Sequence, residues 1–453
     1  MVIQMKLSRY KNRDKVKPYL ILTIGLFLIT VSAYFLYESY ALYEEAKDFN
    51  VINGTVEDPG DIYFAYYIDG EISREMPSQN TGYTLDVEKS SCNNGVIPDW
   101  DNAGWKFIGD YHNYNAPTNT RTKCNLYFNK TSKTVSTVLG NIEVNSYTPD
   151  FTKSACDDET CESHEKGIYE TTDYDGNPTY YYRGSVENNY VKFAGYYWRI
   201  IRINSNGSIR IVYDGTSSHE NGEVSEDRQI GKSQFSSSWD DNMYVGYMYN
   251  NNDIHGILIS STLKMTLDSF YESKVSNLIE KLDLTEGFCN NRQILNVDMS
   301  SGLLKNITYY ENYLDVIEST ASLKCDNKLD YFTISESLDG NKALVYPIGT
   351  ITVPEVIFAG YAGGYFNGMK NYNKTNLNGY LTIGNDYWTM SPVGFYNPFG
   401  YYGNFPVVFL INSKGRFDDS GVENNLGVRP VINIRSDVTI TGIGTMTDPY
   451  VVN

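Results

Sequence analysis

A loop dense in aromatic residues near the C-terminus is the segment best suited to contact a ligand. It reads SPVGFYNPFGYYGNFP and holds Tyr396, Phe399, Tyr401 and Tyr402 among glycines and prolines. Aromatic rings on a loop stack on sugars or peptides, as tyrosine-rich antibody loops do. The same rings can instead fold back into the core. The sequence therefore predicts a ligand-binding loop here, with core packing as the alternative.

The next candidate is an acidic loop, GRFDDSGVENN, which supplies Asp418, Asp419 and Glu423. Carboxylate oxygens in a flexible loop suit Ca²⁺, the one cofactor that the sequence suggests. A solvated turn accounts for the same residues, and the calcium signature of an EF-hand is absent. A shorter acidic fragment lies at Asp173 to Asn177.

Signatures of catalysis are missing. The chain contains no G-x-S-x-G, and its four histidines offer few general bases. With 55 Asp and Glu residues, a glycosidase pair cannot be chosen from sequence. Zinc is disfavoured because no C-x-x-C occurs and the histidines show no ligand spacing with the cysteines. We therefore expect a protein that is not an enzyme.

The six cysteines form an even set, which in an exported chain indicates disulfides. Sequence-local pairing predicts three bonds, although other connectivities are formally allowed. The predicted pairs are Cys92–Cys124, Cys156–Cys161 and Cys289–Cys325.

An uncharged apolar run near the N-terminus predicts a membrane helix. It reads PYLILTIGLFLITVSAYFLY from Pro18 to Tyr37, long enough to cross a hydrocarbon core of about 30 Å. Basic residues precede it and acidic ones follow, so the N-terminus should be cytoplasmic and the rest extracellular. A cleaved signal peptide ending at Ala41 is the rival interpretation, but the run is longer than such peptides usually have.

The net charge of −18 is concentrated after this run, because the first 17 residues are basic. A body this acidic is repelled by nucleic acid phosphates, so DNA or RNA should not be a partner. The expected partners are the membrane and an external glycan or surface protein.

Turn residues and hydrophobic periodicity predict an α+β chain in six parts. These are a basic tail (1–17), a transmembrane signal anchor (18–40), a stalk (41–60), a small all-β module (61–132), a linker (133–178) and an α+β domain (179–453).

Within the last domain, Asn204–Gly207 and Asn412–Gly415 each predict a tight hairpin turn. Helical spacing predicts a helix over Ser261–Leu282. A second helix should begin near Thr352, where Thr352 and Glu355 form a capping-box pattern. Strands at both ends of the domain, VRPVINI among them, should pair with each other.

An ordered set of motifs over about residues 180–453 resembles a family of uncharacterised bacterial membrane-anchored surface proteins with a C-terminal domain of unknown function. The motifs include YYYRGSVENNYVKFAGYYWRIIRINSNGSIRIVYDGT, TVPEVIFAG, YWTMSP and GVRPVINI. That domain is in turn distantly similar to formylglycine-generating-enzyme and C-type-lectin-like folds. The formylglycine activity needs a late cysteine pair, and the last cysteine here is Cys325. The resemblance therefore implies the fold without that chemistry.

The resemblance also points to Trp388 in WTMSP and Arg429 in GVRP. A ligand pocket between them is one interpretation; a core tryptophan and a buried structural arginine are the other. Together these patterns predict an extracellular, membrane-anchored protein that binds a glycan or protein ligand without catalysis. The alternatives are a structural spacer of the cell envelope and an enzyme acting on wall glycan.

Overall fold

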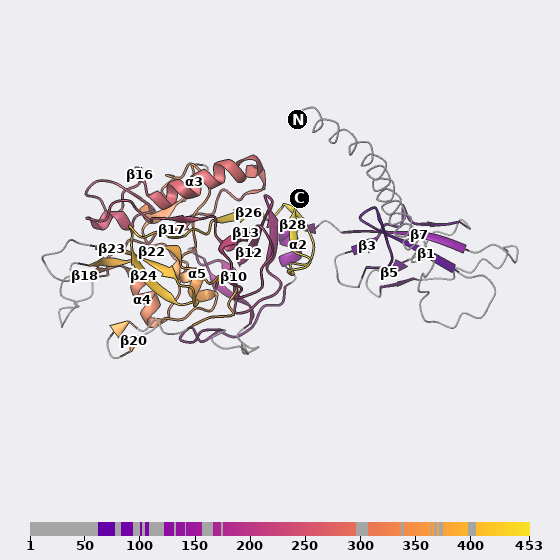
Figure 1. Ribbon diagram of the computed structural model, residues 1–453, viewed down its shortest axis with the longest axis horizontal. Coiled ribbons are helices and arrows are strands. Elements are labelled where there is room, and N and C mark those ends of the chain that lie inside the picture. The colour runs from indigo at the N-terminus through magenta and orange to yellow at the C-terminus, as the bar shows by residue number, and fades with distance from the viewer. Residues whose placement is uncertain are drawn as a thin grey trace, which may run out of the picture. The chain divides into compact units, whose positions relative to one another are not determined.

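The computed structural model divides the chain into two compact units (Figure 1). The smaller unit covers Met1–Ser78 and Thr84–Asn129, and the larger unit covers Gln79–Tyr83 and Lys130–Asn453. The residues that the structure describes are 62–77, 83–93, 100–101, 105–107, 122–130, 133–140, 142–155, 166–173, 175–295, 307–335, 337, 339–363, 365–366, 369–370, 375–396 and 405–453.

The smaller unit is built on a sheet with the strand order β2-β1-β7-β3, and β4 also pairs with β7. Strands β1 and β7 run parallel, and Tyr67 stacks on its cross-strand partner Tyr127 at 4.4 Å between ring centroids. Cys92 and Cys124 are partners across β4 and β7 and form the predicted disulfide. The strands are β1 (Ile62–Ile68), β2 (Glu71–Ser73), β3 (Tyr83–Leu85), β4 (Ser91–Cys92), β7 (Thr122–Lys130) and a separate pair, β5 (Trp100–Asp101) with β6 (Lys106–Phe107).

A nine-stranded sheet is the centre of the larger unit, with the order β26-β13-β12-β11-β28-β27-β8 and with β10 and β9 extending from β12. Strand β13 lies between β12 and β26, and every one of its residues is buried. The strands are β8 (Lys133–Thr134), β9 (Gly167–Thr172), β10 (Pro178–Arg183), β11 (Tyr190–Phe193), β12 (Tyr196–Ile203), β13 (Ile209–Gly215), β26 (Val431–Ile434), β27 (Thr439–Thr441) and β28 (Tyr450–Val452).

A second sheet of the larger unit has the order β14-β25-β22-β23-β24, with β18 paired to β22. Its strands are β14 (Lys232–Ser233), β18 (Ile307–Tyr309), β22 (Tyr387–Tyr396), β23 (Phe405–Ile411), β24 (Phe417–Gly421) and β25 (Leu426–Gly427). Three short pairs complete the strands: β15 (Met248–Tyr249) with β16 (Ile259–Ser260), β17 (Phe288–Cys289) with β19 (Tyr331–Phe332), and β20 (Tyr365–Phe366) with β21 (Met369–Lys370).

Helices are few and short in the part of the chain that the structure describes, so the fold is α+β and rich in sheet, in agreement with the predicted class. Helix α4 packs on β22 and α5, and α5 also contacts β10. The helices are α2 (Val135–Leu139), α3 (Thr262–Lys274), α4 (Glu311–Glu318), α5 (Val353–Phe358) and the 3₁₀ turns η2 (Glu226–Arg228), η3 (Asn242–Val245), η4 (Ser276–Lys281) and η5 (Lys328–Asp330).

Both predicted hairpins are confirmed. β12 and β13 are antiparallel about a turn in which Gly207 has φ +79°, a conformation that a residue with a side chain rarely adopts. β23 and β24 pair in the same way about Gly415, with φ +64°. The ends of the unit also pair, because β13 joins β26 and β11 joins β28.

Two predictions differ from the structure. The helix expected to end at Leu282 ends at Lys274, where Val275 leaves helical geometry and a kinked 3₁₀ segment follows. The stretch 133–178 was expected to be a linker, but β8 and β9 within it belong to the large sheet. Val135 and Leu139 of α2 join the same core. The segment was predicted to be a linker because its composition is rich in threonine and acidic residues, which does not indicate strands.

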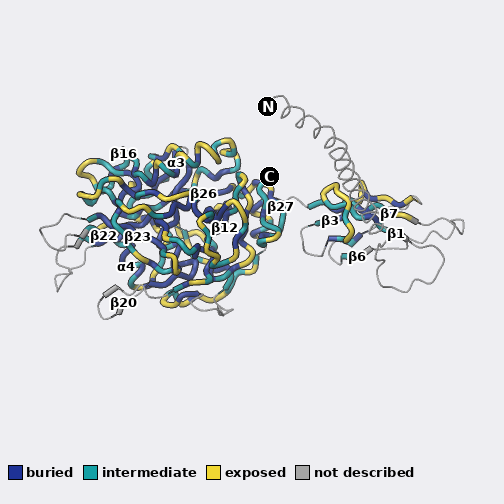
Figure 2. Tube along the Cα trace, viewed as in Figure 1, coloured by how far each residue is buried: buried dark blue, intermediate teal, exposed yellow. Residues whose placement is uncertain are grey.

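The core of the larger unit is continuous from the large sheet to the second sheet (Figure 2). Within the described ranges, no helix has the length and apolar character needed to span a bilayer. The predicted anchor (18–40) and the pair Cys156–Cys161 lie outside the described residues.

Candidate ligand-binding site

A pocket of about 560 Å³ opens in the larger unit, a volume typical of small-molecule sites. Among the described residues that line it, the charged side chains are mainly acidic, with nine Asp or Glu against three Arg or Lys. The acidic side chains come from segments as far apart as Asp173 and Glu355. A pocket of this charge favours a ligand that is hydroxylated or carries positive charge.

Two arginines of the central hairpin reach the pocket. Arg202 of β12 and Arg210 of β13 are cross-strand partners, next to a register shift between Ile200 and Arg202. Such irregularities redirect side chains at functional positions. Both side chains are at least nine-tenths buried.

The carboxylate of Glu355 neutralises part of this charge. The predicted capping box is present: Glu355 Oε2 accepts hydrogen bonds from Thr352 N at 2.9 Å and Oγ1 at 3.0 Å. Its other oxygen, Oε1, lies 2.6 Å from Arg210 Nε and 3.3 Å from Arg202 Nε. One residue therefore caps α5 and holds the two arginines at the pocket.

Helix α4 contributes an acidic face. Glu311, Asp315 and Glu318 share one side of the helix and line the pocket. Burial raises the pKa of the Asp315 carboxyl to about 7, the hydrogen bond from Thr320 opposes this shift, and the neighbouring Glu311 and Glu318 add to it. Asp315 is therefore a lining carboxyl whose charge changes near neutral pH.

Asparagine at position 315 should stabilise the protein more at about pH 8 than at about pH 5. The native state holds the Asp315 proton up to about pH 7, whereas the unfolded chain releases it near pH 4. As the pH rises between these two values, ionisation of Asp315 progressively lowers the free energy of unfolding of the wild type. Asparagine does not ionise, so, relative to the wild type, the variant should be more stable at the higher pH by on the order of 1–3 kcal/mol. Urea unfolding of both proteins at the two pH values measures the difference. The control Glu272→Gln, at an exposed position, should change the free energy of unfolding by the same amount at both pH values. An equal effect of Asp315→Asn at both pH values would contradict a raised pKa for Asp315.

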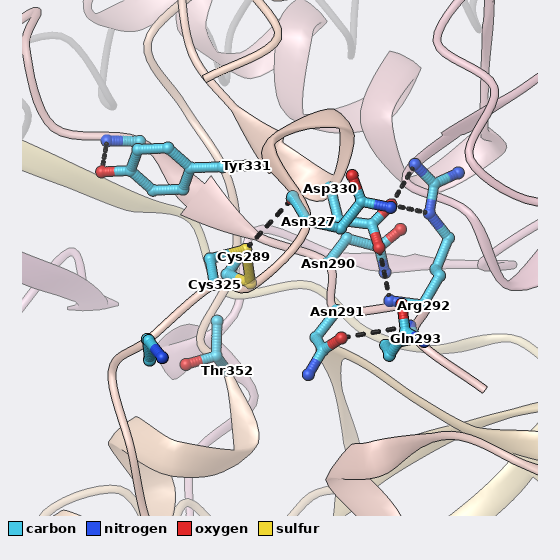
Figure 3. The surroundings of a disulfide bond; sticks show 12 residues. Cys289, Asn290, Asn291, Arg292, Gln293, Cys325, Asn327, Asp330, Tyr331 and Thr352 are labelled. Carbon is cyan, nitrogen blue, oxygen red and sulfur yellow. Dashed lines mark hydrogen bonds and ion pairs between the residues drawn. A yellow bond between two sulfur atoms is a disulfide. The ribbon is translucent and has the colours of Figure 1, made fainter. Parts of the chain in front are cut away.

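A disulfide lies at the pocket, where Cys289 is part of the lining (Figure 3). It joins Cys289 of β17 to Cys325 and matches the predicted pair. Beside it, Asp330 accepts hydrogen bonds from Arg292 N and Nε, both at 2.8 Å. The Tyr331 hydroxyl accepts one from Gly287 N at 2.9 Å. These contacts fix both ends of the segment that carries α4.

The side chains of Trp388 and Arg429 are fully buried, away from the pocket lining. Trp388 Nε1 donates to Ser233 O at 2.8 Å. Arg429 donates to Tyr213 O, Leu381 O and the Asp214 carboxylate at 2.9–3.0 Å. These contacts support the structural alternative for both residues rather than a ligand pocket between them.

The aromatic loop falls largely outside the described residues, and this holds for Phe399, Tyr401 and Tyr402. Tyr396 is the last residue of β22, and its side chain is also outside them. The binding loop therefore stays a prediction.

The calcium candidates do not gather around one point. Asp418 and Asp419 are consecutive residues of β24, so their side chains lie on opposite faces of the sheet. Glu423 follows after that strand ends. Over the described ranges, no group of three or more His, Cys, Asp or Glu residues is arranged to hold a metal ion.

Most of the pocket lining was missed at the level of sequence; the exceptions include the acidic fragment Asp173 to Asn177 and Glu355, which the sequence singled out for other reasons. Two signals point to the missed residues: arginines within an otherwise apolar hairpin, and acidic residues repeated on one face over 311–318. Comparisons with models of protein families, with curated proteins and with solved structures found no match to this chain.

Proposed function

We propose that this chain is a membrane-anchored extracellular protein whose larger unit binds a small polar ligand, such as part of a glycan or of a protein, without transforming it. The observation that carries the proposal is the acidic pocket of about 560 Å³. The pocket is built from several segments and reinforced by a disulfide, which is the preorganisation that binding sites need.

The proposed location rests on two features. The apolar run before residue 41 has basic residues on its N-terminal side. Two of the predicted disulfides are formed, which suits an oxidising compartment. We also propose, from the motif resemblance, that the larger unit is related to C-type-lectin-like domains.

An enzyme acting on wall glycan is the second candidate, and Asp315 is the observation in its favour. A carboxyl with a pKa of about 7 in a polar pocket has the protonation that a general acid needs. Release of reducing ends from wall glycan that disappears in Asp315→Asn would support this candidate. If no ligand binds and no activity is found, the structural spacer of the cell envelope remains as the function.

The test of binding uses the full chain in detergent micelles and a panel of glycans and peptides, with and without Ca²⁺. A ligand present at about 100 times its Kd should stabilise the fold by about 2.7 kcal/mol, seen as a higher melting temperature. The double variant Glu311→Gln/Glu318→Gln should lose this shift, and the double variant Glu272→Gln/Glu280→Gln, outside the pocket lining, should keep it. A panel without any shift, or a shift indifferent to the α4 variant, would count against the pocket.

A further inference from the structure

The Arg202 guanidinium is buried in the pocket lining without a hydrogen bond. Its side chain is 10% exposed, and among the described residues its contacts are two ion pairs. Nε lies 3.3 Å from Glu355 Oε1 but lacks hydrogen-bond geometry, and Nη2 lies 3.9 Å from Glu286 Oε2. Nε is the guanidinium atom that is buried without a hydrogen-bond partner, and leaving a buried N–H donor unpaired is costly. Arg202 is therefore placed to receive an anionic acceptor from a ligand.

Glu286 is the matching feature of opposite charge. Its side chain is 19% exposed and lines the same pocket just before β17. Burial raises the pKa of this carboxyl, while the charges of Arg202 and Arg210 lower it and those of Asp283 and Asp173 raise it. No described residue donates a hydrogen bond to it, and 3.9 Å is too long for one from Arg202. The carboxylate is therefore placed to receive a cationic donor.

We propose that Arg202 and Glu286 bind the head group of a zwitterionic α-amino acid, with the ligand carboxylate on Arg202 and its α-ammonium on Glu286. This assignment rests on the proposed function of the pocket and names the ligand class. The two groups are adjacent and form a long ion pair of 3.9 Å without a hydrogen bond, so both charges of one amino acid can be satisfied without breaking a hydrogen bond of the fold. Charge-assisted bonds of this kind are among the strongest in proteins.

The rest of the lining selects the ligand side chain. Arg210 and Glu355 neutralise each other, Lys324 pairs with Asp326 at 3.2 Å, and Arg202 is assigned to the ligand carboxylate. The acidic face of α4, with Glu311, Asp315 and Glu318, has no basic residue of its own helix beside it. A side chain that ends in a positive charge complements this face. The ligand is therefore a basic amino acid, for which L-lysine is the simplest probe.

Calorimetric titration of the full chain in micelles with four probes tests each contact separately. L-lysine should bind most tightly. Cadaverine lacks the carboxylate, 6-aminohexanoate lacks the α-ammonium, and L-norleucine lacks the side-chain charge; each loss should weaken binding by roughly tenfold to a hundredfold.

Variants assign the two halves of the head group. Arg202→Gln should weaken lysine binding by a similar factor and leave cadaverine binding unchanged, whereas Glu286→Gln should weaken lysine binding and leave 6-aminohexanoate binding unchanged. A variant that is merely misfolded would lose affinity for all four probes, so this selective pattern of losses would not result from misfolding. Arg435→Gln, at an exposed arginine outside the pocket lining, is the matched control and should bind lysine as the wild type does. If Arg202→Gln does not fold, Arg202→Lys retains the charge; it should lose part of the affinity for the probes that carry a carboxylate and leave cadaverine binding unchanged.

The possible outcomes distinguish failure of the head-group assignment from failure of the proposed binding function of the pocket. Equal affinity of lysine and cadaverine, or equal losses for all probes in both variants, overturns the head-group assignment. If lysine fails to bind while another ligand of the panel responds to the α4 variants, the ligand class is wrong and the pocket function stands. If no probe and no panel ligand binds, both fall.

Discussion

Asparagine in place of Asp214 is expected to lower the free energy of unfolding by about 3–5 kcal/mol, or to prevent folding altogether. Asp214 is the penultimate residue of the central strand β13, and its side chain is fully buried. Its Oδ1 accepts hydrogen bonds from Arg228 Nε and Arg429 Nη2, both at 2.9 Å. Arg199 Nη1 lies 3.9 Å from the other oxygen. Three buried guanidiniums thus depend on one carboxylate.

The size of this effect comes from what the substitution leaves behind. Asparagine has the same shape but no charge, so the guanidiniums of Arg199, Arg228 and Arg429 would remain buried without a counterion. Carbonyl oxygens such as Thr382 O and Tyr380 O still accept from Arg228, but they carry only partial charge. A buried charge without a counterion is among the most destabilising features that a substitution can leave in a protein core.

Chemical unfolding followed by fluorescence measures the loss. The control is Asp437→Asn, which removes an exposed partner of Arg435 and should leave the unfolding midpoint unchanged. An Asp214→Asn variant as stable as the wild type would mean that the carbonyl oxygens alone suffice for these arginines.

The second large effect is expected from removing the disulfide at the pocket. The double variant Cys289→Ser/Cys325→Ser should lose about 3–4 kcal/mol of stability, because the bond closes a loop with a sequence separation of 36 residues in the unfolded chain. That loop carries α4, so affinity for any pocket ligand should fall as well. Denaturant unfolding and ligand titration of the same sample report the two effects.

The other described disulfide provides the control. Cys92–Cys124 closes a loop of similar length, with a separation of 32, but lies in the smaller unit. Cys92→Ser/Cys124→Ser should leave both the pocket affinity and the unfolding of the larger unit unchanged. Wild-type stability of the Cys289/Cys325 variant would show that pairing of β17 with β19 and the Arg292–Asp330 contact already restrict the loop.

Several elements could be predicted because their causes are local. The hairpin turns at Gly207 and Gly415 follow from a backbone conformation that glycine adopts readily. The start of α5 follows from the reciprocal cap between Thr352 and Glu355. Cysteine pairing could be inferred from proximity in the sequence, and two of the three predicted bonds are present among the described residues.

Other elements could not be read in this way because their causes are distant. The helical spacing of leucines continues past Lys274 to Leu278 and Leu282, but α3 ends at Lys274 and a kinked 3₁₀ segment follows. The two-residue strand β8 exists because β27, some 300 positions later, pairs with it. Such short strands carry no hydrophobic pattern of their own.

The arginines show most clearly which properties the sequence determines and which only the tertiary structure decides. By itself the sequence determined an α+β chain, its two hairpin turns, the cap of α5, its acidic charge and an apolar N-terminal run that predicts export. Only the tertiary structure decided that Arg429 is a partner of Asp214 in the core, and that Arg202 faces a pocket with hydrogen-bonding capacity unused. The physical reason is that the role of a buried charge is set by which groups surround it, and here the opposite charges, Asp214 for Arg429 and Glu286 for Arg202, lie more than 80 positions away in the sequence.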